Sequence, residues 1–89
     1  MSRTKTWQVQ VLIEQEGDTT RTDAVLHTAD GTSLRGTGRA RHNSADPSVP
    51  EIGDELASSR ALVDLGHQLL EAATSDIEAV VGGPVDLRA

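Results

Sequence analysis

The amino-acid sequence predicts an α+β domain in which a three-stranded antiparallel β-meander is followed by one long C-terminal helix. Three observations support this fold class. Apolar and polar residues alternate near the N-terminus, as in a half-buried strand. Two glycine-containing turns separate three segments of this kind, and a helical pattern fills most of the second half of the chain. The 89 residues suffice for one core, so we expect a single domain over 1–89.

The first two strands are expected at about 5–15 and 20–28. Every second residue from Trp7 to Ile13 is apolar, and Gly17-Asp18 supplies a two-residue turn with glycine where a positive φ is needed. This turn places Val9 opposite Leu26. Because both residues are apolar, the turn and the hydrophobic pattern favour the same register.

A third strand is expected at about 32–41, after the turn Ala29-Asp30-Gly31, whose final glycine is typical of a bulged hairpin. Small or apolar residues alternate with polar ones, so one face would meet the helix. The small residues would let the helix backbone come close. The inward residues are Leu34, Gly36, Gly38 and Ala40, and the outward residues are Arg35, Thr37, Arg39 and Arg41.

The helix is expected at about 51–81. Ser48-Val-Pro50-Glu51 has the form of a capping box, and Gly82-Gly83-Pro84 would end the helix. Gly53 leaves open a short extra helix before the long one. The apolar arc comprises Leu56, Val63, Leu70, Ile77 and Val81, with Leu62, Leu65, Leu69, Ala73 and Val80 beside them. Arg60, Asp64, His67, Glu71 and Glu78 would form the solvent side.

This apolar arc is wider than one small sheet needs, and two explanations are open. The C-terminal segment Val85-Asp-Leu87 and the loop after the third strand could cover the surplus. Alternatively, the surplus joins two copies of the chain. We expect a homodimer through Leu62, Leu65 and Leu69, because small cores commonly recruit a second subunit.

Composition excludes several classes of protein. The chain has no cysteine, so it has neither a disulfide framework nor thiolate metal ligands. No apolar stretch approaches the length of a membrane span, and the N-terminus is unlike a signal peptide, so we expect a cytoplasmic protein with no membrane partner. The net charge is −6, with six Lys/Arg against five Asp/Glu in residues 1–45 and two against nine in residues 46–89. Only the first half could therefore carry a basic patch.

No residue set has the spacing of a catalytic or cofactor site. Ser58, Asp64 and His67 lie in the helical pattern without a nucleophile elbow, and the three histidines lack the spacing of metal ligands. Arg35-Gly-Thr-Gly-Arg39 lacks the strand-to-helix setting of a phosphate-binding loop. We therefore expect no enzyme activity, no catalytic residue, no cofactor, no metal and no small-molecule substrate.

The outward face of the sheet is the better candidate for a binding site. Four arginines on one face could contact RNA phosphates: Arg21, Arg35, Arg39 and Arg41. Glu14 and Asp23 on the same face would weaken their field. No aromatic residue is there to stack on bases, so a solvated face that keeps the protein soluble is the alternative interpretation.

The chain resembles a family of small actinobacterial proteins of unknown function with a double-stranded-RNA-binding-domain-like fold. The resemblance rests on the alternating segment from Trp7, on Asp30-Gly, on Gly38-Arg-Ala-Arg, on Asp46-Pro47 and on the run Val49–Ala57. It implies a β-β-β-α architecture and a dimer. Some members are associated with mycobacterial dormancy, and their fold is similar to that of ribosome hibernation factors.

This resemblance implies a non-enzymatic stress- or dormancy-type protein that binds the ribosome or RNA as a dimer. True double-stranded-RNA binders place lysines at the start of their last helix. This sequence has Glu51, Asp54 and Glu55 there, which would repel phosphate. An RNA contact would then use the arginines of the sheet. The alternative is a protein–protein interaction module with no nucleic-acid role.

Overall fold

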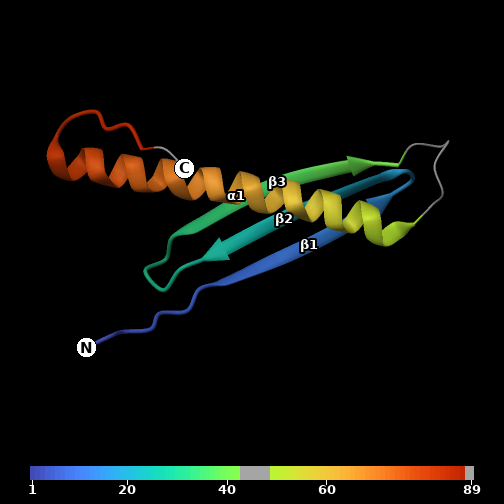
Figure 1. Cartoon of the computed structure of the whole chain (residues 1–89), viewed down its shortest axis with the longest axis horizontal. Coiled ribbons are helices and arrows are strands. Elements are labelled where there is room, and N and C mark those ends of the chain that lie inside the picture. Colours follow the sequence, from blue (N-terminus) through green and yellow to red (C-terminus); the bar gives the residue numbers. More distant parts are fainter. Residues whose placement is uncertain (43–48, 88–89) are drawn as a thin grey trace.

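Three antiparallel strands form one sheet, and a single long helix crosses one of its faces (Figure 1). A computed structural model describes residues 1–42 and 49–87. The elements are β1 (Gln8–Glu16), β2 (Thr19–His27), β3 (Ser33–Arg41) and α1 (Pro50–Val81), and the strand order is β1-β2-β3. The expected α+β class is confirmed, and every element begins and ends within three residues of its predicted position.

Both hairpins have the registers that their turn residues predict. Gly17 has a φ of 61°, and β1 pairs with β2 so that Val9 lies opposite Leu26. Gly31 has a φ of 90°, and β2 pairs with β3 so that Leu26 lies opposite Leu34. Glycine adopts these positive φ angles without steric cost. The turns therefore determine which residues share a face of the sheet.

The backbone of α1 lies directly against β3 because two residues of that strand are glycines. A Cβ added to Gly36 would lie 2.8 Å from the Cα of Leu65, and one added to Gly38 would lie 2.8 Å from the Cβ of Arg60. Carbon atoms in ordinary contact are about 3.5–4.0 Å apart. The helix thus occupies the space that strand side chains would need, as the small residues predict.

The core lies between α1 and the inner faces of β2 and β3. It consists of Ala24, Leu26, Ala61 and Leu65, with Leu34 and Leu69 packed against them. Thr22 is fully buried beside this cluster, and its hydroxyl lies 3.4 Å from that of Ser58, so the buried polar group has a partner. Four of the seven buried hydrophobic residues in the described part of the chain are alanines, so the single chain buries little apolar area.

α1 runs without a break from Pro50 to Val81, so no separate short helix ends at Gly53. Val49 holds the N-cap position without a side-chain hydrogen bond, and Ser48, the first residue of the expected capping box, lies outside the described residues. At the other end Gly82 has a φ of 74°, and its N–H donates to the Glu78 carbonyl at 2.8 Å. The expected glycine stop is confirmed.

The side of α1 that meets the sheet differs from the prediction. The buried residues of the helix are Ala57, Ala61 and Leu65. Leu56 and Val63, from the expected apolar stripe, are 46% and 57% exposed. Arg60 and Asp64, expected in solvent, instead bond to β3. Close approach over glycines favours the smallest helix side chains, so α1 turns its alanines inward and leaves larger aliphatic residues outside.

α1 is much longer than the sheet that it covers. Its 32 residues span about 48 Å, whereas each nine-residue strand spans about 30 Å. The last turns of the helix therefore extend beyond the β2–β3 hairpin, where the C-terminal segment folds back along them (Figure 1). Val85 and Leu87 of this segment are half-buried. Val80 and Val81 at the end of α1 remain 86% and 63% exposed. Most of the loop after the third strand, which was also expected to cover the helix, lies outside the described residues.

Candidate binding surfaces

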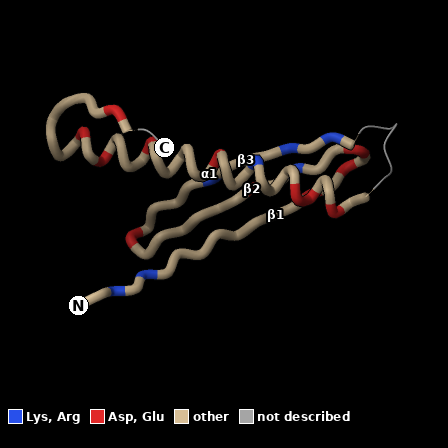
Figure 2. The backbone as a smooth tube through the Cα atoms, in the orientation of Figure 1, with Lys and Arg blue, Asp and Glu red and all other residues tan. Residues whose placement is uncertain are grey.

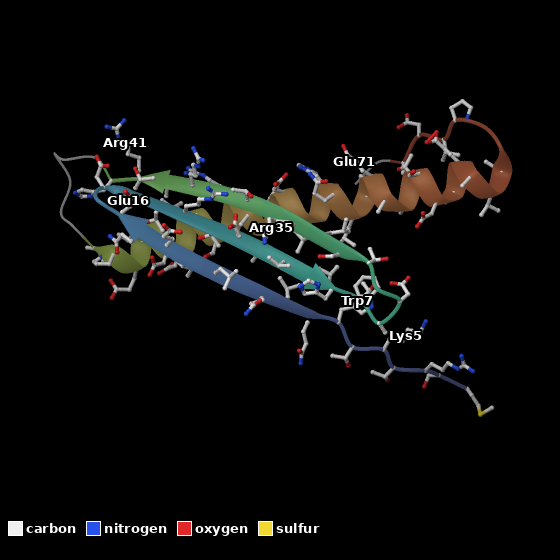
Figure 3. All side chains as sticks on the ribbon, turned by 180° about the vertical axis from the view of Figure 1, so that it is seen from behind. Lys5, Trp7, Glu16, Arg35, Arg41 and Glu71 are labelled. Atoms are coloured by element: carbon white, nitrogen blue, oxygen red, sulfur yellow. The ribbon has the colours of Figure 1, made fainter. Side chains whose placement is uncertain are left out.

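The four arginines predicted as a binding site all lie on the face of the sheet away from α1. Arg21 on β2 lies directly opposite Arg39 on β3. Arg41 lies opposite Thr19, and Arg35 lies near the other end of β3 (Figure 3). In Figure 2 the basic residues of β3 follow the length of the strand, while α1 carries mainly acidic ones. The predicted set is therefore brought onto one face.

Aspartates neutralise part of this basic face. Asp23 lies between two arginines, 3.6 Å from Arg21 and 3.9 Å from Arg35, and it accepts a hydrogen bond from the Thr37 hydroxyl at 3.1 Å. Its carboxylate is 20% exposed, so it is more buried than its partners. Sequence reasoning placed Asp23 on this face but missed its central position. Asp23 follows Arg21 by two residues on β2, and residues at this spacing are neighbours on one face of a strand. This spacing could have predicted the contact.

A third ion pair joins β3 to the first turn. Arg41 Nε lies 3.4 Å from Asp18 Oδ2, and the hydrogen bond from Arg41 lowers the pKa of the Asp18 carboxyl. Both side chains are more than half exposed, so this pair contributes little to stability. Arg39 forms no ion pair with any described residue. Among the residues that the structure describes, Arg39 is thus the one of the four arginines without an acidic partner.

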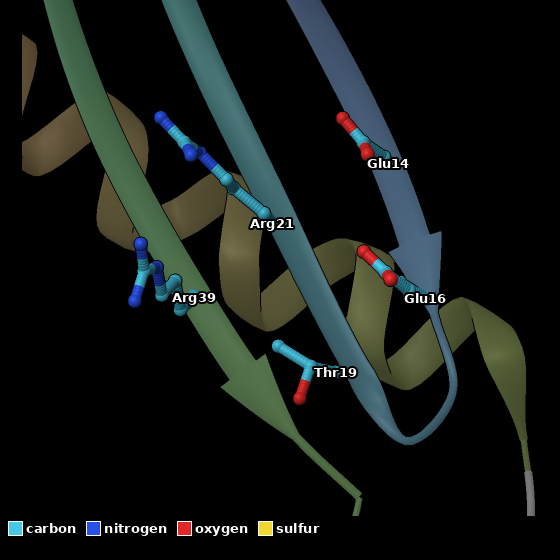
Figure 4. A pocket seen from close by; sticks show the side chains of 5 residues that line it. All are labelled: Glu14, Glu16, Thr19, Arg21 and Arg39. Carbon is cyan, nitrogen blue, oxygen red and sulfur yellow. The ribbon is translucent and has the colours of Figure 1, made fainter.

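A shallow pocket lies on the same face, lined by Glu14, Glu16, Thr19, Arg21 and Arg39. Figure 4 shows the two carboxylates projecting from β1 and the two guanidinium groups from β2 and β3. A phosphate placed among them would meet two negative charges along with two positive ones. The pocket suits a ligand that carries both signs of charge better than it suits a polyanion.

The side chains that the sequence raised as candidates for chemistry lie apart from any cluster of metal ligands in the described residues. No group of three His, Asp or Glu side chains there could hold a metal ion. Ser58, one of the serines considered in the sequence, bonds to Thr22 at the helix–sheet contact. Within the described ranges no helix is long and apolar enough to cross a membrane.

The opposite side of the molecule carries an uncovered apolar surface. α1 packs on β3 and β2 and barely reaches β1, so the inward side chains of β1 lack a cover. Val9, Val11 and Ile13 are 42%, 40% and 47% exposed, and Trp7 beside them is 55% exposed. We call these four residues the β1 apolar face. Sequence reasoning missed its exposure, because the pattern predicts which side chains share a face but not where the helix lies.

The residues predicted for a dimer interface have different positions in the single chain. Leu65 is 3% exposed and belongs to the core, and Leu69 packs against the same cluster. Leu62 is 47% exposed. Leu65 and Leu69 therefore pack within the single chain, and of the three residues only Leu62 presents its side chain outward.

The exposed area of the chain is large for its mass. Its accessible surface is 6934 Å², whereas a folded chain of 9.4 kDa is expected to expose ~5,000 Å². The radius of gyration is 16.8 Å, against ~12 Å for a compact domain of this length. A stable protein–protein interface buries about 800 Å² on each partner. The surplus area is thus sufficient for an interface of ordinary size.

These features define a small α+β protein with two distinct open surfaces, a mixed-charge face and an apolar one. The chain belongs to the Rv2632c-like family, whose model matches residues 5–86. It is 49% identical over 81 residues to the uncharacterized protein Rv2632c of Mycobacterium tuberculosis, covering 91% of this chain and 86% of the relative. It is 47% identical over 81 residues to the uncharacterized protein Mb1767 of Mycobacterium bovis, covering 91% and 85%.

The fold is also that of a solved relative. The crystal structure of Rv2632c matches with a TM-score of 0.83 at 47% identity, over 93% of this chain and 98% of the other. These relatives are mycobacterial, in agreement with the actinobacterial resemblance seen in the sequence. Three antiparallel strands followed by one long helix are thus common to this chain and a solved member of its family.

Proposed function

We propose that this chain is a non-enzymatic protein-interaction module that binds its partner through the β1 apolar face. The observation that carries the proposal is the uncovered inner face of β1, where three aliphatic side chains are each at least 40% exposed. Contiguous apolar surface of this kind marks interaction sites on soluble proteins.

The mixed charge of the other face also supports this proposal. Asp23, Glu14 and Glu16 stand among the arginines, so a nucleic-acid backbone would meet repulsion as well as attraction. A protein surface carries charges of both signs, so its basic groups can lie opposite these carboxylates and its acidic groups opposite the arginines.

Affinity capture from the native host with quantitative mass spectrometry tests the proposal. The bait is the tagged full chain, and the test variant replaces Val9 and Ile13 by serine. Both side chains are exposed in the single chain, so the fold should survive; circular dichroism checks this. The matched control replaces Arg35 and Arg39 by alanine on the other face.

We expect captured proteins that are lost with the serine variant and retained with the arginine control. Capture that is indifferent to Val9 and Ile13 would refute the proposal.

A second candidate function is binding of the ribosome or RNA through Arg21, Arg35, Arg39 and Arg41, in the stress or dormancy setting that the family resemblance implies. The observation that favours it is the direct opposition of Arg21 and Arg39. Like charges opposite each other in a sheet destabilise it, and a bound anion would relieve their repulsion.

Cosedimentation with ribosomes across a salt series tests this candidate. Phosphate contacts predict binding that weakens steeply with salt and is lost when Arg35, Arg39 and Arg41 are all replaced by alanine. No association at low salt would exclude it. A cytoplasmic location stays a prediction under both proposals.

A further inference from the structure

The two edges of the sheet differ in the hydrogen bonds that they receive from α1. At the outer edge of β3, Asp64 accepts a hydrogen bond from the Thr37 N–H at 2.8 Å, and Arg60 donates to the Arg39 carbonyl at 2.6 Å. Side chains of α1 thus satisfy backbone groups that a further strand would use. β1 forms the opposite edge of the sheet (Figure 1). None of the hydrogen bonds that described residues of α1 make goes to β1.

β1 also lacks most of the features that natural proteins use to prevent pairing at an exposed edge. Those features are short length, charged side chains, especially lysine, proline, bulges and inward-pointing charges. β1 is nine residues long, pairs with β2 without a bulge and contains neither proline nor lysine. Its inward residues are aliphatic. Its two charged residues, Glu14 and Glu16, lie at its C-terminal end. The strand is therefore competent to accept a neighbour.

We propose that this neighbour is β1 of a second copy, paired antiparallel about Val11, so that two three-stranded sheets become one six-stranded sheet. The pairing rests on the proposed interaction function and names the partner for its surface. With Val11 opposite itself, Val9 lies opposite Ile13 of the second copy. All inward pairs are then aliphatic, and cross-strand aliphatic pairs stabilise sheets.

Charge selects the antiparallel direction. The segment before β1 is basic, with Arg3 and Lys5, and the end of β1 is acidic, with Glu14 and Glu16. Antiparallel pairing brings the basic segment of each copy beside the acidic end of the other. Parallel pairing would align acidic end with acidic end. The charges of two β1 strands are therefore complementary when the strands pair antiparallel and not when they pair parallel.

The surplus surface fits the same arrangement. The inner side chains of β1 are exposed because α1 packs mainly against β3 and β2. Joining two copies at β1 sets their open faces side by side, so Val9, Val11 and Ile13 of each copy gain neighbours. The pair would draw on the same exposed area that exceeds the expectation for a compact monomer.

Cysteine cross-linking tests the pairing directly, because the natural chain has no cysteine. Residues directly opposite in an antiparallel pair have Cα atoms about 4.5–5.5 Å apart, which is within the range of a disulfide. A Val11→Cys variant should form a covalent dimer under mild oxidation. Leu62→Cys is the matched control, since Leu62 is 47% exposed and Val11 is 40% exposed.

A second experiment uses variants with complementary charges at position 11. Light scattering over a concentration series measures how strongly each variant dimerises. Val11→Lys and Val11→Glu would each face their own charge across the two-fold axis, so each homodimer should weaken by roughly a hundredfold or more. An equimolar mixture of the two variants should restore the dimer. Only a pairing in which residue 11 meets residue 11 predicts this rescue. Circular dichroism of the separate variants verifies that both remain folded.

The remaining outcomes each overturn the pairing. A dimer that persists in Val11→Lys, or that cross-links through Leu62→Cys and not through Val11→Cys, places the interface on α1 instead. A natural chain that is monomeric at every concentration excludes the second copy as partner. In these cases host capture that still depends on Val9 and Ile13 leaves the interaction function standing, so the two failures are distinguishable.

Discussion

Replacing Gly38 by alanine tests the close contact between α1 and β3, on which the whole fold depends. The new Cβ would meet the Ala57 carbonyl oxygen and the Ala61 nitrogen, and it would lie 2.8 Å from the Cβ of Arg60. To restore ordinary contact distances, α1 must withdraw from β3 by roughly 1 Å. Helix backbone atoms cannot rotate aside as a flexible side chain can, so the whole helix has to move.

The expected loss of stability follows from two contributions. Overpacking of a close contact costs about 1–3 kcal/mol. Withdrawal of α1 also lengthens the hydrogen bonds that Arg60 and Asp64 make to β3, and bonds with a charged partner are worth about 1.5–3 kcal/mol each. With partial loss of these bonds we expect about 3 kcal/mol in total. For a domain of this size that lowers Tm by roughly 12–24 °C.

Thermal and urea unfolding followed by circular dichroism, at one fixed protein concentration, measure this effect. The matched control is Gly66→Ala, because Gly66 lies within α1 and a Cβ there meets nothing within 4 Å. Alanine is favoured over glycine inside a helix by about 0.8–1 kcal/mol, so the control should stabilise. Equal and small effects of the two substitutions would refute the close-contact argument.

Three further predictions concern single groups. Asp64→Ala should lower the free energy of unfolding by about 1–3 kcal/mol, because the Thr37 N–H loses its acceptor, whereas Asp64→Asn should retain part of the bond. Thr28→Val should raise the pKa of the Asp30 carboxyl, which the hydrogen bond from the Thr28 hydroxyl holds below 3.8. Gly17→Ala should cost more than Gly66→Ala, since Gly17 has a φ of 61°.

Each of these has its own measurement. Urea unfolding compares the two Asp64 variants, and equal stability of both with the natural chain would contradict the bond to β3. NMR titration of the Asp30 carboxyl gives its pKa. Because the folded pKa is lowered, the contribution to stability is present above pH 3.8 and is lost as pH falls through the folded value. An unchanged pKa in Thr28→Val would contradict the assigned cause. Thermal unfolding ranks the glycine variants.

Much of this protein could be predicted from local patterns. The two turn glycines and the alternation of apolar residues determine both hairpin registers, because a positive φ and a shared face are local requirements. The same registers place Arg21, Arg35, Arg39 and Arg41 on one face. The glycine stop at the end of α1 is also local. None of these features depends on how distant parts of the chain pack.

The position of the helix on the sheet, in contrast, is a property of the tertiary structure. A wide apolar arc allows several helix rotations, and the choice depends on shape: Ala57 and Ala61 fit over Gly36 and Gly38, whereas Leu56 and Val63 do not. That fit moves α1 toward β3, turns Asp64 and Arg60 onto the edge of that strand, buries Leu65 and leaves β1 uncovered.

The candidate surfaces divide in the same way. By itself, the sequence determined that the chain has three strands, one long helix and an arginine-bearing face. Only the tertiary structure decided that Asp23 lies between two of those arginines, that one sheet edge is closed and that the apolar face of β1 is open. The physical reason is the sequence distance over which the interactions act. Turns and the alternation of apolar residues involve residues close in sequence, whereas the position of a helix on a sheet depends on contacts between distant segments.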